Sequence, residues 1–138
     1  MMMVRCYLAP STIEGLGVFC RDDIARGDRV WRYDRMLDIS FPLTKLDQVE
    51  PHVAEFLDRY AYPDINRPGY LILECDEGRF MNHSEWPNLD FSDGVSGRAI
   101  VDIPAGTELT CNYADFLTGE IVMQPPRHMV RPEGVLTN

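Results

Sequence analysis

The chain has 138 residues, a net charge of −9 and 45% hydrophobic residues, a composition that fits one globular domain with a polar surface. No apolar run approaches the roughly 20 residues that a membrane helix needs, and the N-terminal stretch is a poor signal peptide, so we expect a cytoplasmic protein without a membrane segment. The negative charge disfavours direct binding to nucleic acid and attracts a cationic partner.

Short runs of β-forming residues, separated by turn residues, dominate the first third of the chain. They predict strands at residues 7–10, 18–20 and 29–33, and the first two are joined by the glycine-rich connection at residues 13–17. Turn chemistry at residues 24–28 separates the second strand from the third.

Residues 44–60 predict a helical segment. Thr44 and Asp47 resemble an N-terminal capping pair, and Pro51 suits the first turn of a second helical piece. An apolar stripe at helical spacing predicts a face that packs on the core rather than a cofactor site. The stripe consists of Val49, Val53, Phe56, Leu57 and Tyr60.

The second half of the chain predicts strands at residues 70–74, 98–103 and 107–110, and a turn at residues 76–78. The end of the chain has two adjacent prolines and weak periodicity, which is typical of a lid or a loose end. We therefore expect one mostly β, α+β domain at residues 1–116, followed by a C-terminal tail or lid at residues 117–138.

The residue types that usually bind metals are scattered along the sequence. Structural zinc sites take their ligands in close sequence pairs, and neither the cysteines nor the histidines form such a pair. We therefore expect no metal site, and we expect the cysteines to be reduced and mostly buried. The residues concerned are Cys6, Cys20, Cys75, Cys111, His52, His83 and His128.

The segment RFMNHSEWPNL, residues 79–89, suggests three alternatives: a nucleophilic serine, a hydrogen-bonded turn or a ligand pocket. Ser84 lacks the G-x-S-x-G elbow and has no oxyanion-loop signature beside it, which argues against a hydrolase. The glycines of GLG at residues 15–17 lack the third glycine of a dinucleotide motif, and no P-loop lysine follows. They still allow the backbone to come close to a ligand.

Four motifs occur in order: GLGVF, ARGDRVWRYD, GRFMNHSEWPNL and AIVDIPAGTELTCNYADF. Together they resemble the SET domain of protein lysine methyltransferases over about residues 5–116, and the pairing of RFMNHS-x-x-PN with GTELTxxY is the specific part. The resemblance implies a fold of small twisted sheets with a short helical insert. It also implies a knot-like C-terminal core, in which the last motif threads under an earlier loop and meets the NHS segment.

The resemblance also implies S-adenosylmethionine as the cofactor and assigns roles to individual residues. Tyr113 matches the catalytic tyrosine, which also adjoins the cofactor, and Tyr33 matches a second tyrosine that lines the lysine channel. Ser84 and Asn88 would hold the loop that carries Asn82 and His83. The remaining cofactor-binding positions match Gly15, Leu16, Gly17, Arg79, Asn82 and His83.

The sequence departs from the family pattern in the RFMNHS-x-x-PN motif and in residues 117–138. Glu85 and Trp86 stand where many members have a zinc-binding cysteine, and residues 117–138 contain no cysteine. We expect the lid to be made by Phe116 and the segment MQPPRH, or by a second copy of the chain in a homodimer. The chain resembles the minimal, stand-alone bacterial or viral members of the family.

The leading hypothesis is therefore an S-adenosylmethionine-dependent methyltransferase that acts on lysine side chains of a basic protein substrate. The alternative is a non-catalytic SET-like module that binds a protein or the cofactor without turnover. A third hypothesis, a small β-rich interaction protein with fortuitous motifs, predicts that the chain does not bind the cofactor.

Overall fold

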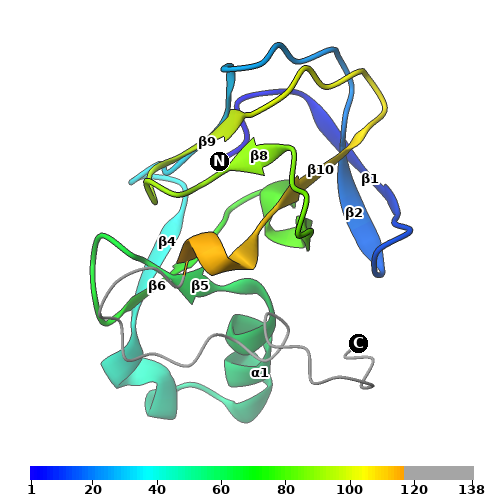
Figure 1. Cartoon of the computed structure of the whole chain (residues 1–138). Helices are drawn as coiled ribbons and strands as arrows, with labels where there is room; N and C mark the ends of the chain where they lie inside the picture. Colours follow the sequence, from blue (N-terminus) through cyan, green and yellow to red (C-terminus); the bar gives the residue numbers. More distant parts are fainter. Residues whose placement is uncertain (117–138) are drawn as a thin grey trace.

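The computed structural model describes residues 1–116, so the predicted tail or lid at residues 117–138 lies outside the described residues. Within residues 1–116, ten short strands form three small sheets, accompanied by one α-helix and three 3-10 helices (Figure 1). The prediction of a mostly β, α+β domain is confirmed. No helix in this part of the chain combines the length and the apolar character that crossing a membrane requires.

The first sheet joins the two ends of the described chain. β1 (Cys6–Pro10) and β2 (Leu16–Cys20) form an antiparallel hairpin around the glycine-rich connection. β10 (Glu108–Cys111) pairs with β2 in antiparallel and with β7 (Asn82–His83) in parallel orientation, so the strand order is β1-β2-β10-β7. The NHS and ELTxxY motifs, distant in sequence, are therefore neighbours in one sheet, as expected.

The second sheet has the order β3-β9-β8 and is antiparallel throughout. It consists of β3 (Arg29–Arg32), β9 (Ser96–Ala99) and β8 (Leu89–Asp90). The predicted strand that continued to Ile103 is too long. After β9 the chain leaves this sheet, and Ile103 instead exchanges two backbone hydrogen bonds of 2.8 Å with Ile24.

The third sheet has the order β4-β6-β5 and carries the helical insert on its side of the molecule (Figure 1). Its strands are β4 (Ile39–Pro42), β6 (Tyr70–Leu73) and β5 (Tyr62–Pro63), all antiparallel. The single described α-helix, α1 (Pro51–Tyr60), packs on this sheet through Leu57. The apolar stripe of the helix therefore contributes to the core, although only one of its members is buried.

The predicted helix at residues 44–60 is divided into two pieces, η1 (Leu43–Gln48) and α1. Glu50 stands between them in an extended conformation, with φ −59° and ψ 147°. A residue that precedes a proline is pushed toward this conformation, and α1 begins with a proline. The predicted capping pair of Thr44 and Asp47 is wrong, because η1 begins without a side-chain cap.

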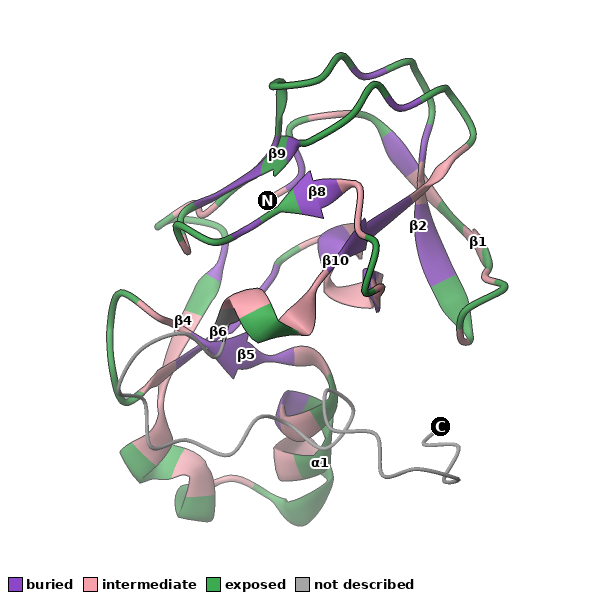
Figure 2. Ribbon diagram, viewed as in Figure 1, coloured by how far each residue is buried: buried purple, intermediate pink, exposed green. Residues whose placement is uncertain are grey.

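Two hydrophobic clusters hold the sheets together (Figure 2). The larger cluster combines side chains of the first and second sheets with Tyr62 and Ile72 of the third. Among its fully buried members are Val18, Val30, Trp31, Leu89, Ile103 and Leu109. The smaller cluster joins α1 to the third sheet through Leu57, Ala61, Leu71 and Leu73. Burial of this apolar surface is the main force that assembles three sheets too small to be stable alone.

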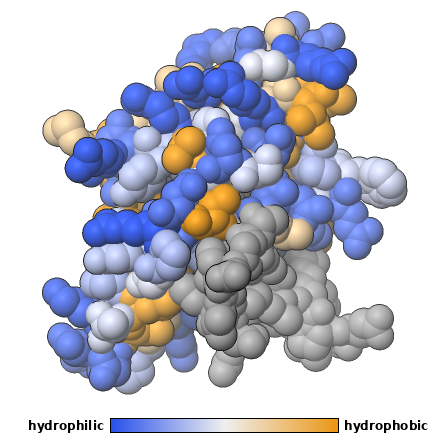
Figure 3. Space-filling model, turned by 60° about the vertical axis from the view of Figure 1, so that its left-hand side comes forward, coloured by the Kyte–Doolittle hydropathy of each residue, from blue (hydrophilic) through white to orange (hydrophobic). Residues whose placement is uncertain are grey.

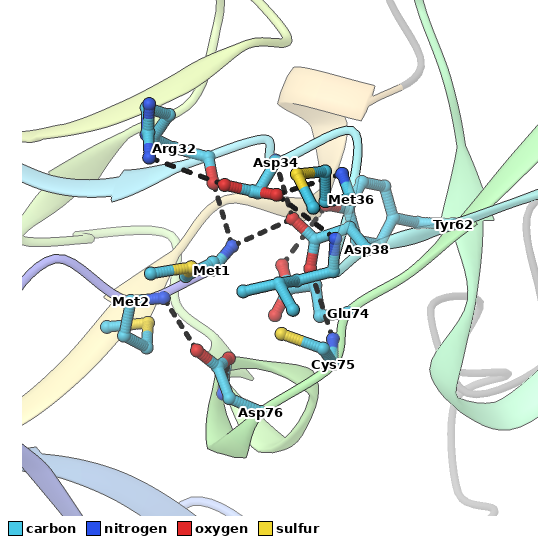
Figure 4. Close-up of polar contacts among 12 residues, drawn as sticks. Met1, Met2, Arg32, Asp34, Met36, Asp38, Tyr62, Glu74, Cys75 and Asp76 are labelled. Carbon is cyan, nitrogen blue, oxygen red and sulfur yellow. Dashed lines mark hydrogen bonds and ion pairs between the residues drawn. The ribbon is translucent and has the colours of Figure 1, made fainter.

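A buried carboxylate, Asp38, connects the N-terminal residues to the segments before β4 and after β6 (Figure 4). It accepts hydrogen bonds from the amino group of Met1 at 3.0 Å and from the backbone N–H groups of Asp34 at 2.8 Å and Cys75 at 3.1 Å. The charge of Asp38 is thus compensated, as a buried charge has to be.

Glu74 lies in the same network, but its buried carboxyl group has fewer hydrogen-bond partners than that of Asp38 (Figure 4). Its Oε1 accepts a hydrogen bond from the Tyr62 hydroxyl at 3.1 Å, whereas its buried Oε2 has no hydrogen-bond partner among residues 1–116. Burial raises the pKa of Glu74 to about 7, with Asp76 and Asp38 adding to the rise and the Met1 amino group and Tyr62 opposing it. Glu74 therefore keeps its proton in the folded protein under mildly acidic conditions.

We predict that the stability of the domain decreases as pH rises from about 4.5 to about 7. The folded state keeps the Glu74 proton in this window, whereas the unfolded chain releases it near the ordinary carboxyl pKa of 4.5. The protonated Glu74 therefore contributes its full stabilisation below pH 4.5. This contribution to the free energy of unfolding, roughly 3 kcal/mol, is lost as the pH rises to about 7. Urea unfolding at pH 5 and pH 8 measures the difference, and Glu74→Gln is expected to remove it.

The matched control is Asp47→Asn, which removes an exposed carboxyl from η1 and is expected to leave the pH dependence of the wild type unchanged. If Glu74→Gln retains the full pH dependence, another group is responsible for it.

Candidate functional site

A cleft of about 280 Å³ opens beside the first sheet. This volume is just below the range typical of sites that hold small ligands. Four segments form it: the glycine-rich connection, the end of α1, the 3-10 helix η2 (Glu77–Phe80) with the residues that lead into β7, and Tyr113 after β10. Its lining residues are Glu14, Gly15, Leu16, Arg59, Tyr60, Arg79, Phe80, Met81, Asn82 and Tyr113.

The glycine-rich connection forms one wall of the cleft with its backbone. The N–H of Ser11 donates to the carbonyl of Gly15 at 2.8 Å, and the Ser11 hydroxyl accepts from the N–H of Ile13 at 2.9 Å. Gly15 has φ +47°, a left-handed conformation that glycine adopts without steric cost. The turn is thereby fixed with Glu14 and Leu16 beside the cleft.

Asn82 ties this wall to the centre of the sheet. The side chain is largely buried, and its Nδ2 donates to the carbonyl oxygens of Glu14 at 3.1 Å and Leu16 at 3.2 Å. The same nitrogen donates to the Glu108 carboxylate at 2.9 Å. Asn82 therefore holds the glycine-rich connection against β7 and β10.

Tyr113 opens η3 (Tyr113–Phe116), directly after β10, and is fixed at two atoms. Its backbone N–H donates to Nδ1 of His83 at 3.0 Å, and the two rings lie 5.1 Å apart. Its hydroxyl donates to the carbonyl of Met81 at 2.9 Å. Both partners flank Asn82 in sequence, so the strand that carries the amide also positions the phenol.

The loop after β7 is fastened to β10, as expected for Ser84 and Asn88. The N–H of Ser84 donates to the carbonyl of Cys111 at 2.9 Å. The side chain of Asn88 donates to the Glu108 carbonyl and accepts from the Thr110 N–H, both at 2.8 Å. These contacts give Ser84 and Asn88 a structural function.

Aromatic rings and two arginines form the opposite wall. The ring of Tyr60 lies 4.9 Å from Phe56 and 5.4 Å from Phe80, measured between ring centroids. The guanidinium of Arg59 lies 5.6 Å from the Tyr60 ring, and that of Arg79 lies 5.8 Å from Phe56, both within cation–π range. The cleft thus has an aromatic wall with a local excess of positive charge on a negatively charged chain.

The structure brings together five of the residues that the sequence predicted for the site, namely Gly15, Leu16, Arg79, Asn82 and Tyr113. Two others lie directly behind the lining: Gly17, which adjoins Glu108, and His83, which holds Tyr113. Tyr33 follows β3, where its N–H donates to the Val95 carbonyl at 3.0 Å and its side chain packs on the larger core cluster. The functional roles assigned to these residues stay predictions.

Sequence analysis missed several residues of the cleft and its support. The missed lining residues are Glu14, Arg59, Tyr60, Phe80 and Met81, and the missed supporting residues are Ser11 and Glu108. Tyr60 was assigned to the core because its helical spacing matched the apolar stripe, and periodicity does not show what meets the end of a helix. Glu108 carried a usable signal, because it is the acidic residue of the ELT motif.

Two titratable groups on β10 and η3, Cys111 and Asp115, are shifted toward their neutral forms. Burial raises the pKa of the Cys111 thiol well above its ordinary value, and Glu74 and Asp115 add to the rise. Burial likewise raises the pKa of Asp115, against the effect of its hydrogen bond from the Phe91 N–H. Among residues 1–116, no group of three His, Cys, Asp or Glu side chains is arranged to hold a metal ion.

Solved structures with the same fold include three informative relatives. The Neurospora SET domain protein DIM-5, a histone lysine methyltransferase, matches with TM-score 0.56 and 26% identity over 81% of this chain and 53% of its own. A candidate histone methyltransferase of Plasmodium falciparum matches with TM-score 0.55 and 22% identity over 81% of this chain and 95% of its own. The Chaetomium thermophilum Polycomb Repressive Complex 2, bound to S-adenosylmethionine, matches with TM-score 0.60 and 22% identity over 82% of this chain and 15% of its own.

The last two matches, below 25% identity, show the fold alone. The resemblance to the minimal, stand-alone bacterial or viral members of the family stays a prediction. No curated protein sequence matches the chain. The family model for the SET domain matches residues 15–114, a range that covers most of the chain and includes every predicted site residue. The chain therefore belongs to the SET domain family.

Proposed function

We propose that this protein transfers a methyl group from S-adenosylmethionine to the side chain of a lysine in a protein. The observation that carries the proposal is the meeting of the Asn82 amide and the Tyr113 phenol at one cleft, held by the two motifs of a SET domain. Two relatives support it, because DIM-5 is a histone lysine methyltransferase and the Chaetomium complex was solved with S-adenosylmethionine.

The residues of the cleft fit the chemical groups of this cofactor. An aromatic wall with Tyr60 and Phe80 suits a flat base, and the guanidinium of Arg79 suits a carboxylate. Oxygen atoms of Glu14 and Asn82 suit an ammonium group. When bound, the cofactor supplies a methyl group on a sulfonium. We propose that the residues holding it are Gly15, Leu16, Gly17, Arg79, Asn82 and His83, with Tyr113 beside them.

Tyr113 would orient the lysine amine. Its phenolic proton is committed to the Met81 carbonyl, so toward an amine its oxygen acts as an acceptor. A lysine ammonium, with an ordinary pKa near 10.4, has to lose a proton before it can accept a methyl group, and partly apolar surroundings favour that loss. The chain then contributes mainly alignment. We propose that Tyr33 lines the channel through which the lysine arrives.

The surface of the protein suits a basic substrate. The chain carries a net charge of −9, and Figure 3 shows a face that is largely hydrophilic, with small, separate hydrophobic areas. Electrostatic attraction would speed the encounter with a lysine-rich protein and would repel nucleic acid. We further propose that residues 117–138 or a second copy of the chain close the cleft over its ligands.

We predict that Asn82→Ala weakens the binding of S-adenosylmethionine roughly tenfold or more, because it removes an amide that both faces the cleft and fixes its wall. Isothermal titration calorimetry measures the dissociation constant. Asn66→Ala is the matched control, since Asn66 bonds to the Asp93 carbonyl in a surface loop. Equal affinity of Asn82→Ala and the wild type would remove Asn82 from the site.

We predict that Tyr113→Phe retains affinity for S-adenosylmethionine but slows methyl transfer about 100-fold, because the hydroxyl acts on the amine and not on cofactor binding. Transfer of radiolabelled methyl groups to a mixture of basic proteins measures the rate. Tyr7→Phe, a change on β1 outside the cleft lining, is expected to leave it unchanged. Cofactor binding without any transfer by the wild type would favour the non-catalytic module instead.

A further inference from the structure

Glu108 begins β10 and places its carboxylate over the glycine-rich connection. It pairs in register with Phe19, so its side chain lies on the same face as that of Phe19 and as Gly17, two residues earlier. A Cβ atom on Gly17 would collide with the Glu108 carboxylate. Glycine at this position thus creates the space that the carboxylate occupies.

The carboxylate bonds both to Ser11, directly after β1, and to Asn82 on β7. Both of its oxygens accept from the Ser11 hydroxyl, at 2.7 and 2.9 Å. Oε2 also accepts from Nδ2 of Asn82 at 2.9 Å. Hydrogen bonds to an ionised acceptor are stronger than those between neutral groups, so this carboxylate is the strongest acceptor that Asn82 meets.

The surroundings of Asn82 determine which end of its amide faces inward. Nδ2 lies among three acceptors, the carbonyl oxygens of Glu14 and Leu16 and the Glu108 carboxylate. A reversed amide would place Oδ1 against three oxygen atoms that accept hydrogen bonds and would remove the Asn82 donor from all three. Oδ1 accepts no hydrogen bond from residues 1–116, and Asn82 lines the cleft, so this oxygen is available to a ligand.

We infer that Glu108 is a positioning residue. Its carboxylate orients the Asn82 amide so that Oδ1 of Asn82 faces the cleft, and it holds the glycine-rich connection in place through Ser11. The inference rests on the proposed function in one respect, that the ligand is S-adenosylmethionine, whose ammonium group is a donor for Oδ1. Glu108 itself does not line the cleft. It acts on the ligand only through Asn82 and the glycine-rich connection.

A double-mutant cycle with S-adenosylmethionine tests this arrangement by calorimetry. Glu108→Ala is expected to weaken binding roughly tenfold, because the amide loses the acceptor that fixes it. In the Asn82→Ala background, Glu108→Ala is expected to reduce the affinity for S-adenosylmethionine much less, since no amide remains to be oriented. Ser11→Ala, which keeps the contact between Glu108 and Asn82, is expected to weaken binding less than Glu108→Ala.

The matched control is Asp102→Ala, which removes an exposed carboxylate that accepts a hydrogen bond from the Arg26 N–H, remote from the cleft. It is expected to leave affinity unchanged. If Glu108→Ala does not fold, Glu108→Gln replaces it, with a smaller, several-fold loss because the acceptor becomes neutral. Unchanged affinity of the Glu108 variant, or losses that add fully in the double mutant, overturns the positioning role.

Nuclear magnetic resonance of the Asn82 side-chain amide supplies a measurement that needs no ligand. Glu108→Ala is expected to shift the two NH₂ signals and to speed their exchange with water, whereas Asp102→Ala leaves both unchanged. If these signals respond but the wild type does not bind S-adenosylmethionine, the positioning role stands and the proposed function fails. If they do not respond, the positioning role is wrong whatever the wild type binds.

Discussion

A strand in the interior of a sheet has to find hydrogen-bond partners along both of its edges, and β10 meets this requirement with segments from distant parts of the chain. One edge pairs with β2, and the other pairs with β7. At the beginning of β10, the side chain of Asn88 bonds to the backbone carbonyl of Glu108 and to the backbone N–H of Thr110. The segment from β7 to Asn88 therefore provides the hydrogen-bond partners that the backbone of β10 needs along this edge, and its polar residues serve as these partners.

The alternation of side chains along β10 separates its structural and functional contributions. Leu109 and Cys111 are buried in the larger core cluster. Glu108 and Thr110 point the other way, toward the glycine-rich connection and the loop at Asn88. Tyr113 follows immediately. One short strand therefore anchors the sheet in the core and supplies residues that support the cleft.

The sequence was informative wherever a pattern is local or a motif is specific. Alternation and turn residues predicted most strands, and the pairing of RFMNHS with ELTxxY predicted that these segments meet. Pro51 was expected to open a second helical piece, but its effect on Glu50, which divides the two pieces, was not used. The cleft residues that the sequence did not predict are placed there by contacts between distant segments. The spacing of Tyr60 is that of a core residue, and only the approach of Phe80 turns it into a cleft wall.

The position of β10 also affects how the chain folds as it leaves the ribosome. Among the described strands β10 comes last in the sequence, so β2 has one unpaired edge and β7 has no strand partner until residues 108–111 emerge. The larger core lacks Leu109 and Cys111 until then, so the described domain cannot complete its packing before residues 108–111 have emerged. During that interval the exposed strand edges are open to pairing with other chains, which makes the growing chain vulnerable to aggregation until β10 is in place.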